Sequence, residues 1–284
     1  MPEVKAIDFQ RFPLTHSFTT KWDEGKQGEL MCRIEKSLGG RMPEYDDVEK
    51  AIEDMDAAGV EKVGLITPKI WSYWKQKMFI DTPLSDVLPY IEKYPDRFFG
   101  IAGYNPFHMK ESLKEIETAV KEYNFRGVYI HIYGYDIPLH DPKLMYPLYE
   151  KCVELDIPIV PQVGHVLEAM YGEHGRPIYL DRIAADFPEL KILGSHTGYP
   201  WVEELISVCY KWDNIWFGCS AWMPRLWSPA IVQYVNSRLG AERCIWGTNM
   251  LPWKECLQQI DALGLREENK NRLIRENAIE LFKL

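Results

Sequence analysis

Short runs of β-branched and apolar residues recur along the chain at nearly regular spacing, and amphipathic helical stretches separate them. The predicted strands are residues 4–9, 62–66, 98–103, 127–132, 157–162, 191–195, 215–219 and 244–247. Alternation of strands with helices is typical of a parallel sheet joined by helical crossovers. Eight such units predict an α/β fold, a (β/α)8 TIM barrel, and a chain of 284 residues has the ordinary length of one such barrel. We therefore expect a single domain spanning residues 1–284.

The connections between the strands fit this architecture, with one exception. Amphipathic helices are predicted at residues 44–58, 109–123, 142–155 and 202–210, and a last helix at 267–282. Residues 12–43 are too many for a plain strand-to-helix connection, and they are rich in polar residues and glycine. We expect this segment to cover the barrel mouth as a lid.

Charge and cysteine usage exclude several classes of function. The chain has 33 basic and 42 acidic residues, and its net charge of -9 repels phosphate backbones and anionic membranes. The first ten residues resemble no signal peptide, and no apolar run is long enough to span a membrane. Six cysteines occur without a C-x-x-C pair, so neither a disulfide framework nor a zinc knuckle is indicated. We expect a cytoplasmic protein that binds neither nucleic acid nor membrane.

Polar and aromatic side chains gather where the predicted strands end. Active sites of TIM barrels form at the carboxyl ends of their strands, so these residues are the candidates for function. They are Asp8, Gln10, Phe12, Lys69, Tyr104, Asn105, His131, Tyr133, Gln162, His165, His196, Thr197, Ser220, Trp222 and Asn249.

Several of these segments resemble one family. The most specific run is GRPIYLDRIAADFPELKILGSHTGYPW at residues 175–201, supported by AIDFQRFP at 6–13, GVYIHIYG at 127–134, IPIVPQVG at 157–164 and CIWGTN at 244–249. The chain resembles, over nearly its whole length, the amidohydrolase-related proteins that include aminocarboxymuconate semialdehyde decarboxylase and the resorcylate-type decarboxylases. The resemblance implies a TIM barrel and, in most members, a divalent metal in its mouth.

The metal ligands that the family pattern implies are mostly replaced in this sequence. Gln10 and Phe12 stand where the pattern has two histidines after the first strand, Gln162 replaces the fifth-strand histidine, and Asn249 replaces the eighth-strand aspartate. His196 alone matches the pattern. A primary amide is a weak neutral ligand and phenylalanine is none, so we expect no metal cofactor at this position. The amides of Gln10, Gln162 and Asn249 can instead orient a small polar or carboxylated ligand.

Two histidines are the candidates for catalysis. His196 matches a family histidine that acts as general acid or base, and His131 ends the fourth strand beside Tyr133. Arg176 resembles a family loop arginine and could clamp a carboxylate, although a surface ion pair is an equally good interpretation. Tyr104 and Trp222 complete the predicted substrate-binding set with the three amides.

Several hypotheses about function stay open at this point. The first is a metal-independent enzyme that hydrolyses a small carboxylated cyclic or aromatic compound, with decarboxylation of an aromatic or muconate-like acid as the alternative reaction. The second is a metal enzyme whose zinc or other divalent ion has moved to His131, His165, His196 and Asp8. The third is a barrel that has lost catalysis. From the resemblance we also expect a homodimer.

Overall fold

The computed structural model describes residues 5–13, 15, 18–20, 47–166 and 168–284. Most of the expected lid at residues 12–43 lies outside this part of the chain, as does Cys32. No helix of the described residues is long and apolar enough to cross a membrane.

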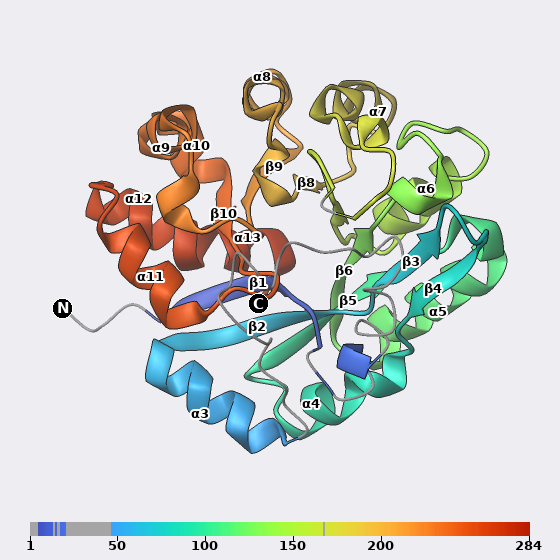
Figure 1. Cartoon of the computed structure of the whole chain (residues 1–284), viewed down its shortest axis with the longest axis horizontal. Coiled ribbons are helices and arrows are strands. Elements are labelled where there is room, and N and C mark those ends of the chain that lie inside the picture. Colours follow the sequence, from blue (N-terminus) through green and yellow to red (C-terminus); the bar gives the residue numbers. More distant parts are fainter. Residues whose placement is uncertain (1–4, 14, 16–17, 21–46, 167) are drawn as a thin grey trace.

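Eight parallel strands form a barrel with a ring of helices around it (Figure 1). In spatial order they are β1 (Ala6–Arg11), β2 (Val60–Ile66), β5 (Phe98–Gly103), β6 (Phe125–Ile130), β7 (Ile159–Pro161), β8 (Ile192–Gly194), β9 (Ile215–Cys219) and β10 (Cys244–Trp246). Backbone hydrogen bonds close the barrel between its first and last strands, because Asn249 N donates to Gln10 O at 2.7 Å and Phe12 N donates to Asn249 O at 3.0 Å. The predicted TIM barrel is confirmed.

The helices lie outside the strands and pack their apolar faces on them (Figure 1). They are α3 (Val48–Ala58), α4 (Leu88–Lys93), α5 (Met109–Glu122), α6 (Tyr146–Glu154), α7 (Leu180–Asp186), α8 (Val202–Lys211), α9 (Pro229–Asn236), α10 (Arg238–Arg243), α11 (Trp253–Asp261), α12 (Glu267–Asn271) and α13 (Asn277–Phe282). Asp47 caps α3 by accepting a hydrogen bond from Glu49 N, and Gly59 ends it at φ 76°. A wider π-helical stretch, Arg272–Glu276, joins α12 to α13 within the predicted closing helix.

Aromatic rings fill the barrel interior below the mouth. The rings of Phe9 and Phe99 lie 6.2 Å and 5.5 Å from that of Phe282, and all three side chains are buried. Glycines leave room for these rings, since a Cβ at Gly64 would lie 2.7 Å from the ring of Phe99 and one at Gly247 would lie 2.8 Å from that of Phe9. The resulting floor confines any site to the mouth above it.

An antiparallel hairpin that the sequence pattern does not predict, β3 (Lys69–Ser72) and β4 (Lys77–Asp81), follows β2. Its residues alternate in polarity only over four or five positions, too few to distinguish a hairpin from a loop. Lys69 belongs to this hairpin and forms ion pairs with Asp81 at 2.6 Å and Glu115 at 3.3 Å. Its charge is therefore already paired by these carboxylates.

Candidate active site

The ends of six strands bring polar side chains together at the barrel mouth. The side chains that the sequence predicted there are at most 9% exposed, and several are buried completely. They come from the ends of β1, β6, β7, β8, β9 and β10, and they are Gln10, His131, Gln162, His196, Ser220 and Asn249. Burial of so many polar groups costs free energy unless each finds a hydrogen-bond partner. The polar atoms without a partner in the protein are therefore the ones that can bind a ligand.

Gln10 is held at the mouth by a hydroxyl from β9. Ser220 Oγ donates to Gln10 Oε1 at 3.2 Å and accepts from His196 N at 3.0 Å. The Nε2 atom of Gln10 is buried and has no hydrogen-bond partner among the described residues. The amide therefore has its carbonyl side engaged and its NH2 side free for a ligand.

Gln162 has the same arrangement on the other side of the mouth. Its Oε1 accepts a hydrogen bond from the hydroxyl of Tyr129 at 2.6 Å, and Tyr129 lies two residues before His131 on β6. The hydroxyl of Tyr133 donates to backbone oxygens of the loop after β7, at 3.2 Å from Gln162 O and 2.9 Å from Gly164 O. Burial, together with the nearby charge of Glu168, raises the pKa of both tyrosines far above its usual range. Both phenols therefore remain protonated donors.

His196 occupies a left-handed turn directly after β8. Its φ is 66° and that of Thr197 is 58°, a conformation that costs free energy in residues with a Cβ and is common at functional sites. Neither ring nitrogen has a hydrogen-bond partner in the part of the chain that the structure describes. Burial lowers the pKa of His196 to about 3, and repulsion from His131 adds to this effect while the charge of Glu168 opposes it. His196 is therefore neutral at physiological pH.

The structure adds Glu168, which the sequence analysis missed. Its Oε1 lies 3.8 Å from His131 Nε2, and their side chains are 9% and 1% exposed. Burial disfavours a charged carboxylate, yet the pKa of Glu168 lies below its usual range because His131, a backbone hydrogen bond and His196 together outweigh burial. Glu168 lies in the loop after β7, where no local sequence pattern marks it. The site thus contains an ionised carboxylate beside one imidazole and near a second, neutral one.

Arg176 is the first of three predicted substrate-binding side chains that have other partners in the structure. Arg176 is 35% exposed, forms ion pairs with Glu204 and Glu173, and lies 5.6 Å from the ring of Trp201. Its guanidinium thus has the surface ion pairs that were the alternative interpretation.

The two predicted aromatic side chains have local partners. Tyr104 is buried, and its hydroxyl donates to Leu144 O at 2.5 Å. Trp222 is partly exposed with its ring 4.6 Å from that of Tyr199, so these two rings lie together at the rim.

Asp8 and Arg11 face the helices rather than the barrel mouth. An irregularity in the pairing of β1 with β2 lies between them, so the simple alternation that would put Asp8 and Gln10 on one face is broken. Asp8 accepts hydrogen bonds from Thr248 N at 2.8 Å and from Trp253 Nε1 of α11 at 2.7 Å. Arg11 lies 4.0 Å from Asp8 and 3.9 Å from the ring of Trp253. Asp8 is thus engaged in a structural network outside the mouth.

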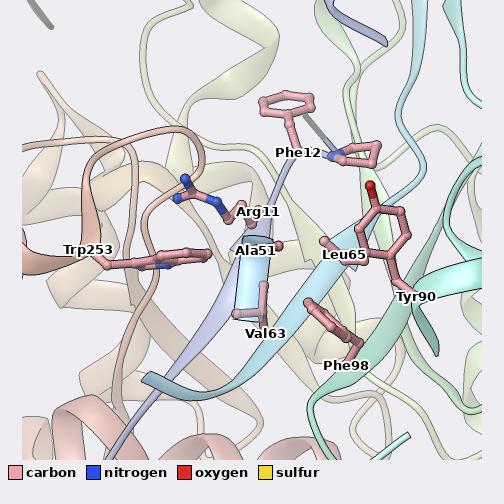
Figure 2. A pocket seen from close by; sticks show the side chains of 9 residues that line it. Arg11, Phe12, Ala51, Val63, Leu65, Tyr90, Phe98 and Trp253 are labelled. Atoms are coloured by element: carbon pink, nitrogen blue, oxygen red, sulfur yellow. The ribbon is translucent and has the colours of Figure 1, made fainter. Parts of the chain in front are cut away.

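A small cavity lies beside this network, between the sheet and the helices (Figure 2). Residues of β1, β2, β5, α3, α4 and α11 contribute to its wall, which includes Arg11, Val63, Phe98, Tyr90 and Trp253. Its volume of about 20 Å³ holds about one water molecule. The cavity is too small for an organic substrate, and His131 and His196 do not contribute to its wall.

The sequence as a whole matches a known family. A model of the amidohydrolase family matches residues 34–284. The chain belongs to this family. It is thus an enzyme of the amidohydrolase type on a TIM barrel. A 2-keto-4-carboxy-3-hexenedioate hydratase from a Sphingobium species is 25% identical to this chain over 231 residues, 68% of this chain and 67% of the relative.

Solved structures share the fold at lower sequence identity. A TIM-barrel protein of Bordetella bronchiseptica has a TM-score of 0.77 and 24% identity, covering 98% of both chains. A 5-carboxyvanillate decarboxylase of Novosphingobium aromaticivorans, solved with manganese, has a TM-score of 0.70 and 17% identity over 99% of this chain and 97% of its own. A 2,6-dihydroxybenzoate decarboxylase of Rhizobium has a TM-score of 0.70 and 18% identity, covering 98% of this chain and 98% of its own. These likenesses show the fold.

The residues of this amidohydrolase do not fit the metal that the family pattern implies. Gln10, Gln162 and Asn249 offer only neutral amides at the family's ligand positions, and Phe12 lines the small cavity outside the sheet. Within the described ranges, no three His, Cys, Asp or Glu side chains are grouped so that they could hold a metal ion.

The relocated metal set proposed from the sequence is also not brought together. His165 is exposed and its ring lies against Gly172, while Asp8 faces Trp253. The positive φ of 97° at Gly164 does let the loop turn, but it does not carry His165 into the mouth. The two side chains are apart from the histidines of the mouth because Asp8 is held by Trp253 and the loop after β7 exposes His165.

Proposed function

We propose that this amidohydrolase decarboxylates a small, conjugated carboxylic acid without a metal, using His131 to deliver a proton to carbon. The observation that carries the proposal is the ionised, buried Glu168 that lies 3.8 Å from His131 Nε2. A fixed carboxylate stabilises the imidazolium that a proton donor must form, as in other carboxylate–histidine pairs.

The reaction follows from these groups. His131 donates the proton of Nδ1, the ring nitrogen that does not pair with Glu168, to the carbon that bears the carboxylate. The carbon–carboxylate bond then breaks, and its electron pair returns to the conjugated system as carbon dioxide leaves. His131 regains a proton from water. Glu168 balances the positive charge of His131 before the transfer and again after reprotonation. The buried mouth excludes water from the substrate carboxylate, which favours its loss as neutral carbon dioxide.

The protonation state of His196 argues against hydrolysis, the main expectation from the sequence. Hydrolysis without a metal requires a base that takes a proton from water. An imidazole with a pKa of about 3 is a weak base, so His196 suits hydrogen bonding to the substrate better than activation of water. His196 and His131 thus take different roles, although both are buried imidazoles at the same mouth.

Addition of water to a carbon–carbon double bond is the second candidate, since the hydratase relative carries that activity in its name. Hydration also requires proton delivery to carbon, so the same His131–Glu168 pair would serve it. Mass spectrometry identifies decarboxylation by the loss of the mass of carbon dioxide. Hydration and ring-opening hydrolysis both add the mass of water, and the NMR spectrum of the product distinguishes them.

The test is a screen of hydroxybenzoates and unsaturated tricarboxylates with the natural protein and three variants. His131→Gln, Glu168→Gln and His196→Gln should each reduce turnover of any accepted substrate, with the largest loss for His131→Gln. The matched control is His108→Gln, because His108 is exposed at the start of α5. Full activity of His131→Gln would remove the proposal.

A further inference from the structure

Two amide groups at the mouth make the same kind of hydrogen bond although they come from different strands. Gln10 on β1 and Gln162 after β7 each have Oε1 engaged by a hydroxyl, at 3.2 Å from Ser220 Oγ and 2.6 Å from Tyr129 Oη. Nε2 of Gln10 is buried without a hydrogen-bond partner among the described residues, and no hydrogen bond within that part of the chain uses Nε2 of Gln162. At these positions the family pattern has ligands that bind a cation, whereas this chain presents hydrogen-bond donors.

The hydrogen-bond network fixes the direction of both amides. Ser220 Oγ accepts from His196 N, so its only proton is left to donate to Gln10 Oε1. The phenol of Tyr129 stays protonated, since burial and the charge of Glu168 raise its pKa well above the usual range, and it donates to Gln162 Oε1. Each hydroxyl holds an amide oxygen in place and leaves the NH2 group for a ligand.

The buried NH2 group of Gln10 is suited to bind a ligand. Its side chain is 0% exposed, and its Nε2 is one of the buried polar atoms without a partner among the described residues. An amide donor in that position loses its hydrogen bonds to water and gains none from the protein. A ligand with an acceptor oxygen would supply them, and a carboxylate gives the strongest such bonds.

We infer that Gln10 and Gln162 form a carboxylate subsite, in which their two NH2 groups replace the family's metal in binding the acid group of the substrate. The inference rests on the proposed function, because it assigns the substrate class of the same site. The subsite is neutral: the NH2 groups of Gln10 and Gln162 donate hydrogen bonds to the carboxylate, and no cation is required.

Replacement of each glutamine by glutamate tests the subsite. In Gln10→Glu, Ser220 can still donate to one carboxylate oxygen, and only the group that faces the ligand changes from NH2 to an oxygen anion. Gln162→Glu keeps the Tyr129 bond in the same way. Gln258→Glu is the matched control, since Gln258 is exposed on α11 and the variant gains the same charge far from the mouth.

Benzoate and benzamide serve as probes, and isothermal titration measures their binding to the full chain. We expect the natural protein to bind benzoate at millimolar concentrations and at least about tenfold more tightly than benzamide. Gln10→Glu and Gln162→Glu should each weaken benzoate binding about tenfold or more, and Gln258→Glu should leave it unchanged. Circular dichroism confirms that each variant is folded, and a variant that fails to fold is replaced by Gln10→Met or Gln162→Met, which removes the donor without adding charge.

The outcomes separate this inference from the proposed function. No benzoate binding to the natural protein, equal affinity for benzamide, or unchanged affinity in both glutamate variants would overturn the subsite. Binding requires no turnover, so the subsite stands if these results hold while no acid is decarboxylated. Conversely, decarboxylation that depends on His131 but not on the glutamines would keep the function and remove the subsite.

Discussion

The Nε2 atom of His131 lies 3.8 Å from the Oε1 atom of Glu168, although one residue directly follows β6 and the other lies in the loop after β7. This separation allows an ion pair and is too long for a hydrogen bond. A modest movement on substrate binding would bring the two groups into hydrogen-bond contact, as often happens when a catalytic site closes on its ligand. The pair is therefore the centre of the mechanism proposed for this amidohydrolase.

Removal of the carboxylate of Glu168 should impair catalysis without unfolding the barrel. We expect Glu168→Gln to lower kcat about 10²-fold or more with little change in KM, because the charge that stabilises a protonated His131 is lost. Turnover should persist only toward lower pH, and Glu168→Asp should restore part of the activity. Rate measurements across pH check this, with the exposed Glu189→Gln as the control. An unchanged pH profile in Glu168→Gln would contradict the assigned role.

His196 should make the folded state sensitive to acid. The folded protein holds this imidazole neutral down to a pKa of about 3, whereas the ordinary value is 6.5. Between these values the unfolded chain binds a proton that the folded protein does not, so the free energy of unfolding falls as pH falls. The contribution is up to about 1.4 kcal/mol per pH unit.

Denaturant unfolding of His196→Gln measures that contribution. The variant should show a flatter dependence of stability on pH between pH 6.5 and 4 than the natural protein. Ser220→Ala is a suitable control, because it removes a hydrogen bond to the same turn but no titrating group, so it should lower stability about equally at each pH. An identical slope for the natural protein and His196→Gln would show that His196 titrates normally.

The side chains at the family's metal-ligand positions should bind divalent metals only weakly. Elemental analysis of protein purified without a chelating tag should find zinc, manganese, iron and cobalt far below one equivalent, and dialysis against a chelator should leave turnover intact. The reason is the chemistry of Gln10, Gln162 and Asn249, whose amides bind divalent ions weakly. A full equivalent of metal that is lost together with activity would mean that other residues provide the ligands.

The sequence predicted the barrel well because each strand is a local pattern. Two predicted strands, residues 98–103 and 215–219, coincide with β5 and β9, and the others are shifted by only a few residues. Strands of a parallel barrel are buried on both faces, so each one appears in the sequence as a short hydrophobic run. The mouth residues Gln10, His131, Gln162 and His196 followed from the strand ends, once the fold was fixed.

The parts that sequence reasoning missed depend on contacts between distant segments. Glu168 is a glutamate in a loop, and only the folded barrel brings it to His131. Asp8 was predicted at the mouth together with Gln10, but the pairing of β1 is irregular between Asp8 and Arg11, and Asp8 contacts Trp253 instead. Alternation is a rule for regular strands, and a single register shift reverses it for every residue beyond the shift.

The network of Asp8 and Arg11 should stabilise the fold at the junction of β1 and β10. Both side chains are at most 3% exposed, and Arg11 Nη1 also donates to Thr248 Oγ1 at 2.8 Å and to Leu251 O at 2.9 Å. Burial raises the pKa of Asp8, although the charge of Arg11 and hydrogen bonds from Thr248 and Trp253 favour its charged form. Loss of Asp8 would leave the guanidinium without its counterion in a buried place.

Asp8→Ala should therefore cost about 3–5 kcal/mol in the free energy of unfolding. Asp213→Ala is the matched control, because Asp213 is fully exposed in its ion pair with Arg243, and its loss should leave the free energy of unfolding nearly unchanged. The double variant Asp8→Ala with Arg11→Met should lose less than the sum of the two single variants, since it removes both charges together. Additive losses would show that the two residues stabilise the junction independently, through Trp253 and Thr248 rather than through each other.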